Sequence, residues 1–230
     1  MVSTERPPQP LVVSLAALTV VSGIVDAVSF LALGHVFTAN MTGNVALIGF
    51  GIAGAPAFSV AASACALGLF LVGAVVGGRI SLRLPSERSL LVAVIAIELA
   101  LTIAAAVIAR AHDTVGIGSG WPRYALISLL ALGMGSRNAA VRKIGVPDMS
   151  TTVLTTTLTG FASESFLAGG RNPNAANRTT SVLCMFGGAL VGAVLVQHLH
   201  AGWALVIACV ILFLTALYFY REAPVELGTT

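Results

Sequence analysis

Charged residues are what this sequence lacks most. Only 9% of its 230 residues are Asp, Glu, Lys or Arg, whereas 57% are hydrophobic and the mean hydropathy is +0.96. A water-soluble domain carries about 25% charged residues, so this chain cannot cover a water-facing surface and the lipid bilayer is its expected solvent. The apolar runs are long and unbroken rather than alternating, which favours membrane-spanning helices of about 20 residues over a β-barrel.

Cysteines and enzyme signatures are also scarce. Cys65, Cys184 and Cys209 lie inside apolar runs, without CxxC spacing or a neighbouring His cluster, and this favours a packing role. No HExxH, GxSxG or phosphate-binding glycine loop occurs. No basic stretch alternates with aromatic residues, as nucleic-acid binding would favour. We therefore predict no enzyme activity, no cofactor, no metal site and no nucleic-acid partner.

What the sequence does contain is a series of apolar segments separated by Gly, Pro and charged residues. The first run is longer than a signal-peptide core and has no clean A-x-A cleavage pattern, which predicts a retained span. The segments form two sets of four, so we predict an all-α polytopic membrane bundle in a single domain, 1–230, with repeat halves at 11–110 and 122–221. The segments are 11–33, 37–53, 57–83, 89–110, 122–145, 149–168, 179–198 and 203–220.

Matching motifs in the two sets indicate an internal duplication. The sequence FTANMTG at 37–43 returns as LTTTLTG at 154–160, and both read apolar-Thr-x-polar-apolar-Thr-Gly. LVGAV occurs at 71–75 and again at 190–194. Because the matches keep a common order, they favour two related halves, as in many transporters.

The distribution of Lys and Arg helps to decide how the segments cross the membrane. If 37–53 and 149–168 do not cross fully, nearly all cations face the cytoplasm and only Arg110 and Arg123 lie outside, as the positive-inside rule favours. This predicts six full spans, two short or re-entrant polar helices, oppositely oriented halves and two cytoplasmic termini. The alternative is eight spans in parallel halves, because 37–53 is long enough to cross as a tilted helix.

Four stretches carry a resemblance to a known family. They are GIVDAVSF at 23–30, FTANMTGN at 37–44, GMGSRNAA at 133–140 and MSTTVLT at 149–155. Together they resemble the YoaK-like family of bacterial integral membrane proteins, over nearly the whole chain. The resemblance implies a multi-pass protein of the bacterial inner (cytoplasmic) membrane. It implies no catalytic or binding residues, because the family is one of unknown function.

Charged residues inside apolar segments are costly, at about 3 kcal/mol each on insertion scales, and so they are candidates for function. Asp26 and Glu98 are candidate ion or proton carriers, although each could instead be a structural carboxyl group. Arg137 matches Asp26 when both are counted from Gly34 and Gly145. We predict either an Asp26–Arg137 ion pair or an anionic ligand held by Arg137, with snorkelling of Arg137 to the headgroups as the alternative.

Two clusters of hydroxyl and amide side chains are candidate solute-binding sites. Such groups can replace water around a solute, although they also bond neighbouring helices or their own backbone. The first cluster is Thr38, Asn40, Thr42 and Asn44, and the second is Thr151, Thr155 and Thr159, with Arg137 and Asn138 nearby.

These features favour an inner-membrane transporter or permease for a small polar or anionic solute. The segments 37–53 and 149–168 are expected to meet near the midplane, at the interface of the two halves. The alternatives are a passive channel and a non-transporting scaffold or accessory subunit. Beyond the lipid bilayer and a solute, a homodimer through glycine stripes is the remaining predicted partner. The stripes are Gly73-x-x-x-Gly77 and Gly188-x-x-x-Gly192, which we interpret mainly as close helix packing.

Overall fold

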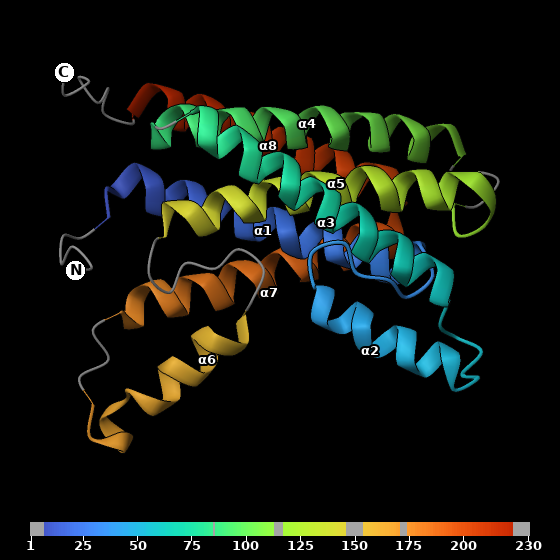
Figure 1. Cartoon of the computed structure of the whole chain (residues 1–230), viewed down its shortest axis with the longest axis horizontal. Coiled ribbons are helices and arrows are strands. Elements are labelled where there is room, and N and C mark those ends of the chain that lie inside the picture. Colours follow the sequence, from blue (N-terminus) through green and yellow to red (C-terminus); the bar gives the residue numbers. More distant parts are fainter. Residues whose placement is uncertain (1–6, 85, 113–116, 146–153, 171–173, 223–230) are drawn as a thin grey trace.

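The computed structural model describes residues 7–84, 86–112, 117–145, 154–170 and 174–222. In these residues the chain forms helices joined by short connections and contains no strand, so the all-α prediction is confirmed (Figure 1). Each predicted segment contains one α-helix, and the segment 149–168 also contains a short 3-10 helix. The elements are α1 (Gln9–Ala32), α2 (Met41–Ile52), α3 (Val60–Arg83), α4 (Glu87–His112), α5 (Gly120–Ile144), α6 (Leu154–Ser163), the 3-10 helix η1 (Phe166–Ala168), α7 (Ala175–His198) and α8 (Ala201–Glu222).

Local sequence signals set several helix ends. Proline occupies the first turn of α1, where its missing N–H costs no hydrogen bond. The Ser59 side chain caps α3 by accepting a hydrogen bond from the Ala62 N–H at 3.2 Å. Gly145 ends α5 in the left-handed conformation (φ 72°), and its N–H donates to the Val141 carbonyl. Short-range chemistry therefore accounts for much of the agreement between predicted and observed segments.

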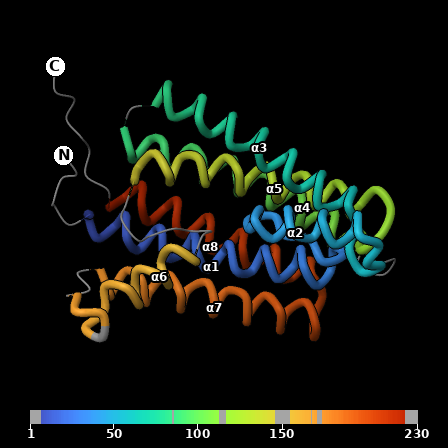
Figure 2. The backbone as a smooth tube through the Cα atoms, turned by 60° about the horizontal axis from the view of Figure 1, so that its bottom comes forward, coloured from blue at the N-terminus to red at the C-terminus, as the bar shows by residue number. Residues whose placement is uncertain are grey.

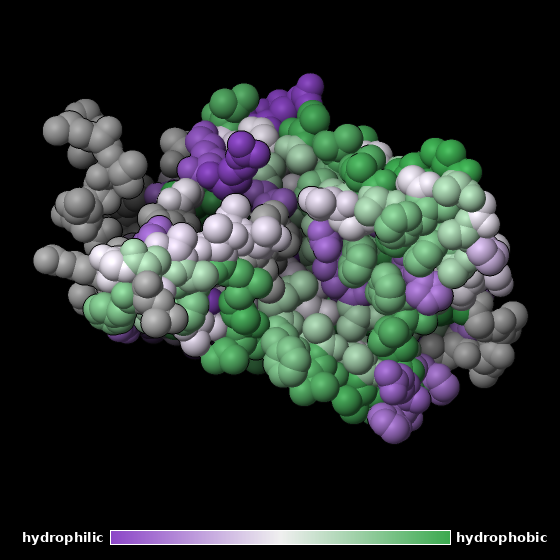
Figure 3. All heavy atoms as spheres, turned by 90° about the horizontal axis from the view of Figure 1, so that it is seen from below, coloured by the Kyte–Doolittle hydropathy of each residue, from purple (hydrophilic) through white to green (hydrophobic). Residues whose placement is uncertain are grey.

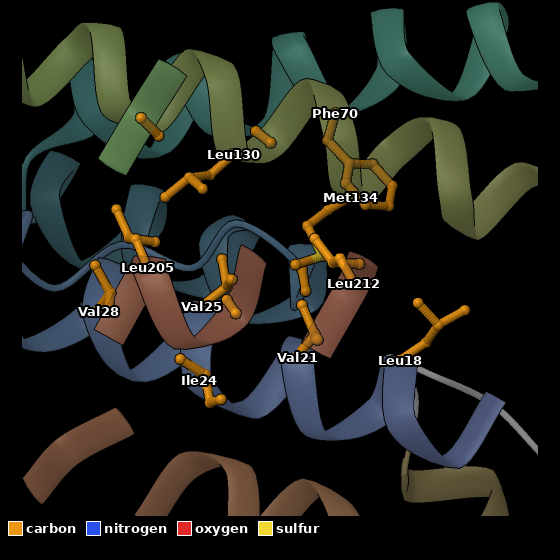
Figure 4. Close-up of a cluster of buried hydrophobic side chains, with 14 of the residues drawn as sticks. Leu18, Val21, Ile24, Val25, Val28, Phe70, Leu130, Met134, Leu205 and Leu212 are labelled. Carbon is orange, nitrogen blue, oxygen red and sulfur yellow. The ribbon is translucent and has the colours of Figure 1, made fainter. Parts of the chain in front are cut away.

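The long helices form the body of the molecule, and α1 lies at its centre. α3 packs on α5, and α7 packs on α1. α4 packs on α5, α8 packs on α1, and α4 and α8 also pack on each other. Figure 4 shows the apolar side chains that fill the space between them, including Val21 and Ile24 from α1, Met134 from α5 and Leu212 from α8. Helices α2 and α6 lie outside this body, against α3 and α7 (Figures 1 and 2).

Five described helices are long and apolar enough to cross a membrane by length and composition, namely α1, α3, α4, α7 and α8. α5 is as long as these, with 25 residues, but it is less apolar because it carries Arg123, Arg137, Arg142 and Lys143. α2 and α6 have 12 and 10 residues. At about 1.5 Å per residue both are too short to cross a hydrocarbon core of about 30 Å.

Figure 1 shows that helices at corresponding places in the two sets run in opposite directions. We call the end of the bundle at which α1 begins and α8 ends the near end, and the opposite end the far end. α1 runs from the near end to the far end, and α5 runs from the far end to the near end. α3 and α7 are likewise opposed, as are α4 and α8. The ends also differ in charge. Arg110 and Arg123 lie at far-end helix termini, whereas the near-end termini carry Arg79, Arg83, Arg88, Arg142, Lys143, Arg178 and Arg221.

Glycine contacts are repeated between the two sets. A Cβ atom added at Gly73 would lie 2.2 Å from the carbonyl oxygen of Leu132 on α5, and one at Gly188 would lie 2.2 Å from that of Val20 on α1. One turn later, Gly77 meets the backbone of Ser136 and Gly192 meets the backbone of Ile24. The α3–α5 packing thus recurs in α7–α1, and only glycine allows the backbones to approach this closely.

This repeated packing corrects two predictions. The match of 71–75 with 190–194 is wrong by one helical turn, because Gly73 corresponds to Gly188. In the same register Asp26 corresponds to Asn138 rather than to Arg137. Both glycine stripes are buried against helices of the same chain, as their interpretation as close helix packing requires, and the homodimer stays a prediction.

The two matching motifs that end in Thr-Gly, at 37–43 and 154–160, have different backbone structures. α2 begins at Met41, in the middle of its motif, and residues 37–40 precede it as a non-helical segment. The second motif, 154–160, is helical along its whole length in α6. Among the described residues α2 and α6 also make no contact with each other. The predicted meeting of the two segments is therefore wrong for this part of the chain.

The surface is mostly apolar, as expected for contact with lipid. Figure 3 shows the face that carries α2, α6 and α7, where hydrophilic side chains gather in small groups between apolar areas. Leu183, Phe186 and Leu190 on α7 are exposed, as are Leu71 and Val75 on α3.

Candidate functional site

A buried ion pair lies in the middle of the bundle. The Arg137 guanidinium donates from Nη1 to Glu98 Oε1 at 2.8 Å and from Nη2 to the Ser22 hydroxyl, so α5 is linked to α4 and α1. Arg137 has 0% and Glu98 1% of its surface exposed. Arg137 therefore does not snorkel to the headgroups. A charge so deeply buried is tolerated because it is paired and hydrogen-bonded.

The predicted Asp26–Arg137 ion pair is wrong, because Glu98 takes the guanidinium instead. Asp26 lies one turn after Ser22 on α1, where it interacts with Arg137 only electrostatically. Its Oδ1 atom accepts hydrogen bonds from the N–H groups of Thr38, at 3.3 Å, and Ala39, at 3.0 Å. Asp26 thus binds the segment that leads into α2, and counting along the sequence could not have shown this.

Residues 37–40 are held in place from α2 as well. The Asn44 side chain accepts from the Phe37 N–H at 3.0 Å and donates to the Phe37 carbonyl at 2.6 Å, so it replaces a missing backbone partner for both groups. The Asn40 side chain caps α2 by accepting from the Gly43 N–H at 3.3 Å. Two of the predicted solute-binding amides therefore make internal hydrogen bonds. Asn40 and Thr42 remain exposed, whereas Asn44 is buried.

Three buried polar atoms near this site have no hydrogen-bond partner within the described residues. They are Thr38 Oγ1, Glu98 Oε2 and Arg137 Nε. Most buried polar atoms in proteins are hydrogen-bonded, and unsatisfied ones tend to mark functional positions. The structure thus brings together Asp26, Thr38, Glu98 and Arg137 in one polar region, while Asn138 lies partly buried beside Arg137 on α5.

The second predicted cluster is arranged differently. Thr155 and Thr159 are exposed on α6, Thr157 between them is buried, and Thr151 lies outside the described residues. Arg178, a largely buried residue near the start of α7, donates to the Gly160 carbonyl at 2.7 Å and to Glu164 Oε2 at 3.0 Å. Sequence reasoning gave Arg178 no contact with α6. A buried arginine that holds a helix C-terminus is favoured by the helix dipole, but the sequence alone does not identify its partner.

Within the described part of the chain, no set of His, Cys, Asp and Glu side chains could hold a metal ion. The three cysteines are free.

Long apolar helices around a paired internal charge define a multi-pass membrane protein. The chain belongs to the family described as "Protein of unknown function (DUF1275)", whose model matches residues 14–218. It is similar to the UPF0700 transmembrane protein YoaK of Bacillus subtilis (strain 168), with 32% identity over 152 residues. That match covers 65% of this chain and 65% of the relative. The resemblance to a YoaK-like membrane family is therefore confirmed. No solved structure matches the chain.

Proposed function

We propose that this protein is a small permease of the bacterial inner membrane, formed by two inverted halves. The single observation that carries the proposal is the placement of the short helices. The amino ends of α2 and α6 point toward the middle of the molecule, and their carboxyl ends point outward, one toward each end of the bundle (Figures 1 and 2). Transporters with inverted repeats use such half-helices, whose positive amino ends favour polar or anionic groups.

The exposed polar residues at and near these amino ends are the proposed solute contacts. Asn40 and Thr42 come from α2 and its cap, Thr155 lies in the first turn of α6, and Thr159 lies one turn further along α6. Behind the first group lies the buried region of Asp26, Glu98 and Arg137. In this proposal Arg137 holds Glu98 rather than the solute, since its guanidinium is fully buried. Six long helices cross the membrane, and the cation-rich near end faces the cytoplasm.

A solute screen tests the proposal. The purified protein in detergent is heated with a panel of small anions and polar solutes, including phosphate, sulfate, acetate and amino acids. A solute that binds only the folded state stabilises it by about 2.7 kcal/mol at 100 times its Kd. We expect stabilisation by one class of solute, and uptake of that class into proteoliposomes. Replacing Thr42 and Thr155 with Val should remove both effects, while the exposed Thr179→Val on α7 serves as a matched control.

The alternatives predict other results. In a passive channel no ion is coupled to flux, so an imposed pH gradient cannot drive solute uptake against a concentration gradient. In a scaffold or accessory subunit, the Thr42→Val and Thr155→Val substitutions lower thermal stability by the same amount whether or not a solute is present. If no solute in the panel stabilises or enters, the permease proposal is overturned in favour of the scaffold.

A further inference from the structure

Among the described residues, the side chain of Asp26 makes the polar contact between the centre of the bundle and the segment before α2. Its carboxylate accepts two backbone N–H groups on a single oxygen, from Thr38 at 3.3 Å and Ala39 at 3.0 Å. Only 6% of Asp26 is exposed, and Thr38 is fully buried. Because residues 37–40 lead directly into α2, this contact is one of those that hold the amino end of α2 against the bundle.

The buried charges around Asp26 do not balance. Asp26 and Glu98 are two carboxyl groups, and the facing cation is Arg137 of α5, whose hydrogen bonds go to Glu98 of α4 and to Ser22. α7 meets this part of α1 through Gly188 and Gly192. Cys209 of α8 interacts electrostatically with Glu98. In the described residues Asp26 therefore has no cation of its own, and a buried unpaired carboxylate is costly unless it takes up a proton.

Proton uptake by Asp26 weakens the contact with residues 37–40. Hydrogen bonds to an ionised acceptor are roughly twice as strong as bonds between neutral groups. The protonated carboxyl group also becomes a donor, and a buried donor left without an acceptor is costly. Neutralisation of Asp26 therefore weakens both of the bonds that hold residues 37–40.

We propose that Asp26 is a proton-binding site, and that its proton releases residues 37–40 and the amino end of α2 from the bundle. Glu98 stays ionised against Arg137 and is not the proton carrier. The inference rests on the proposed function for its role, because it makes the proton the coupling ion of the permease. It names the group that binds this ion and the segment that responds.

The first experiment detects the proton directly and needs no solute. Infrared spectra of the protein in lipid nanodiscs are recorded across a pH series, and the carboxylic-acid C=O band is followed. The other eight Asp and Glu residues also gain protons as the pH falls, so the spectra of wild type and Asp26→Asn are compared. We expect the difference between them to contain a carboxylic-acid band that grows as the pH falls, and we expect the same difference band in a Glu98→Asp background, which keeps a carboxylate for Arg137. No difference band at any pH at which both proteins stay folded, or its loss in the Glu98→Asp background, overturns the proposal.

The second experiment measures the release. Spin labels are placed at the exposed positions Thr42 on α2 and Leu31 on α1, in a protein whose native cysteines are replaced by Ser. We expect the distribution of distances between the two labels to change as the pH falls, with the same pH midpoint as the infrared band of Asp26. Asp26→Asn should show the low-pH distribution at every pH. A label pair at Leu31 and Val13, both exposed on α1, should not respond.

The two proposals can fail separately. An unchanged distance distribution while Asp26 takes up its proton overturns the release mechanism, whatever the solute screen shows. A pH-dependent release without any bound or transported solute would leave the Asp26 inference intact and reject the permease.

Discussion

Arg137 and Glu98 form an ion pair at 2.8 Å in which both side chains are buried, and the hydroxyl of Ser22 on a third helix completes it. The pair joins α5 to α4, while Ser22 joins it to α1. Its position explains why an arginine occurs in the middle of a membrane helix: three helices supply the groups that hold it. In the proposed permease Arg137 therefore has an internal role, and a ligand held by Arg137 stays an untested prediction.

Removing only one member of this pair should be more damaging than removing both. Arg137→Met leaves Glu98 as a buried unpaired charge, and we expect a loss of about 3–5 kcal/mol of unfolding free energy. Adding Glu98→Leu should restore most of that loss. Unfolding in mixed micelles measures both, and the exposed Arg79→Met controls for loss of an arginine as such. A double variant no more stable than Arg137→Met would contradict the pairing.

Neighbouring glycines should respond in opposite ways to alanine. A Cβ at Gly77 would lie 2.2 Å from the Ser136 carbonyl oxygen, whereas at Gly78 nothing lies within 4 Å. Overpacking costs about 1–3 kcal/mol, so Gly77→Ala should destabilise, while Gly78→Ala should be neutral or stabilising by up to about 1 kcal/mol through helix propensity. Thermal unfolding in detergent measures the difference.

Because the α3–α5 packing recurs between α7 and α1, we expect the same difference in stability between two neighbouring glycines of α7. Gly188→Ala should destabilise and Gly187→Ala should not, because only the first meets backbone atoms, those of Val20. Equal effects at Gly187 and Gly188 would refute the described α1–α7 contact.

Asn44→Ala should loosen residues 37–40. It removes the acceptor and donor that satisfy both backbone groups of Phe37. Each buried group left unsatisfied costs about 1–3 kcal/mol. We expect faster hydrogen exchange at the Phe37 amide, measured by mass spectrometry of the corresponding peptide. Asn40→Ala is the matched control, since it removes an exposed cap worth about 1 kcal/mol and leaves the Phe37 bonds intact. Unchanged exchange in Asn44→Ala would exclude this role.

Labelling should place the two short helices on opposite sides of the membrane. In a protein without its native cysteines, Ala57→Cys follows α2 at the far end and Ala168→Cys lies in η1 at the near end. With six spans, a membrane-impermeant maleimide added to intact cells labels position 57, and position 168 reacts only after permeabilisation. Labelling of both positions from the same side of the membrane would support the alternative of eight spans in parallel halves.

The sequence by itself determined the solvent and the elements. Few charges and long apolar runs require a bilayer, and Gly, Pro and polar breaks delimit segments that each contain one α-helix. These are local properties, since backbone hydrogen bonds and helix caps lie within a few residues of one another. The motifs at 23–44 and 133–155 were also sufficient to identify the family, because that match depends on residue order alone.

Only the tertiary structure decided which polar groups meet. Asp26, Glu98 and Arg137 were each visible in the sequence, but a carboxylate can pair with any cation or N–H group that the packing brings near. The glycine contacts of α3 with α5 and α7 with α1 set the helix register, and a shift of one residue turns a side chain by about 100° around a helix. That register placed Glu98, not Asp26, against Arg137 and left Asp26 to hold the backbone before α2.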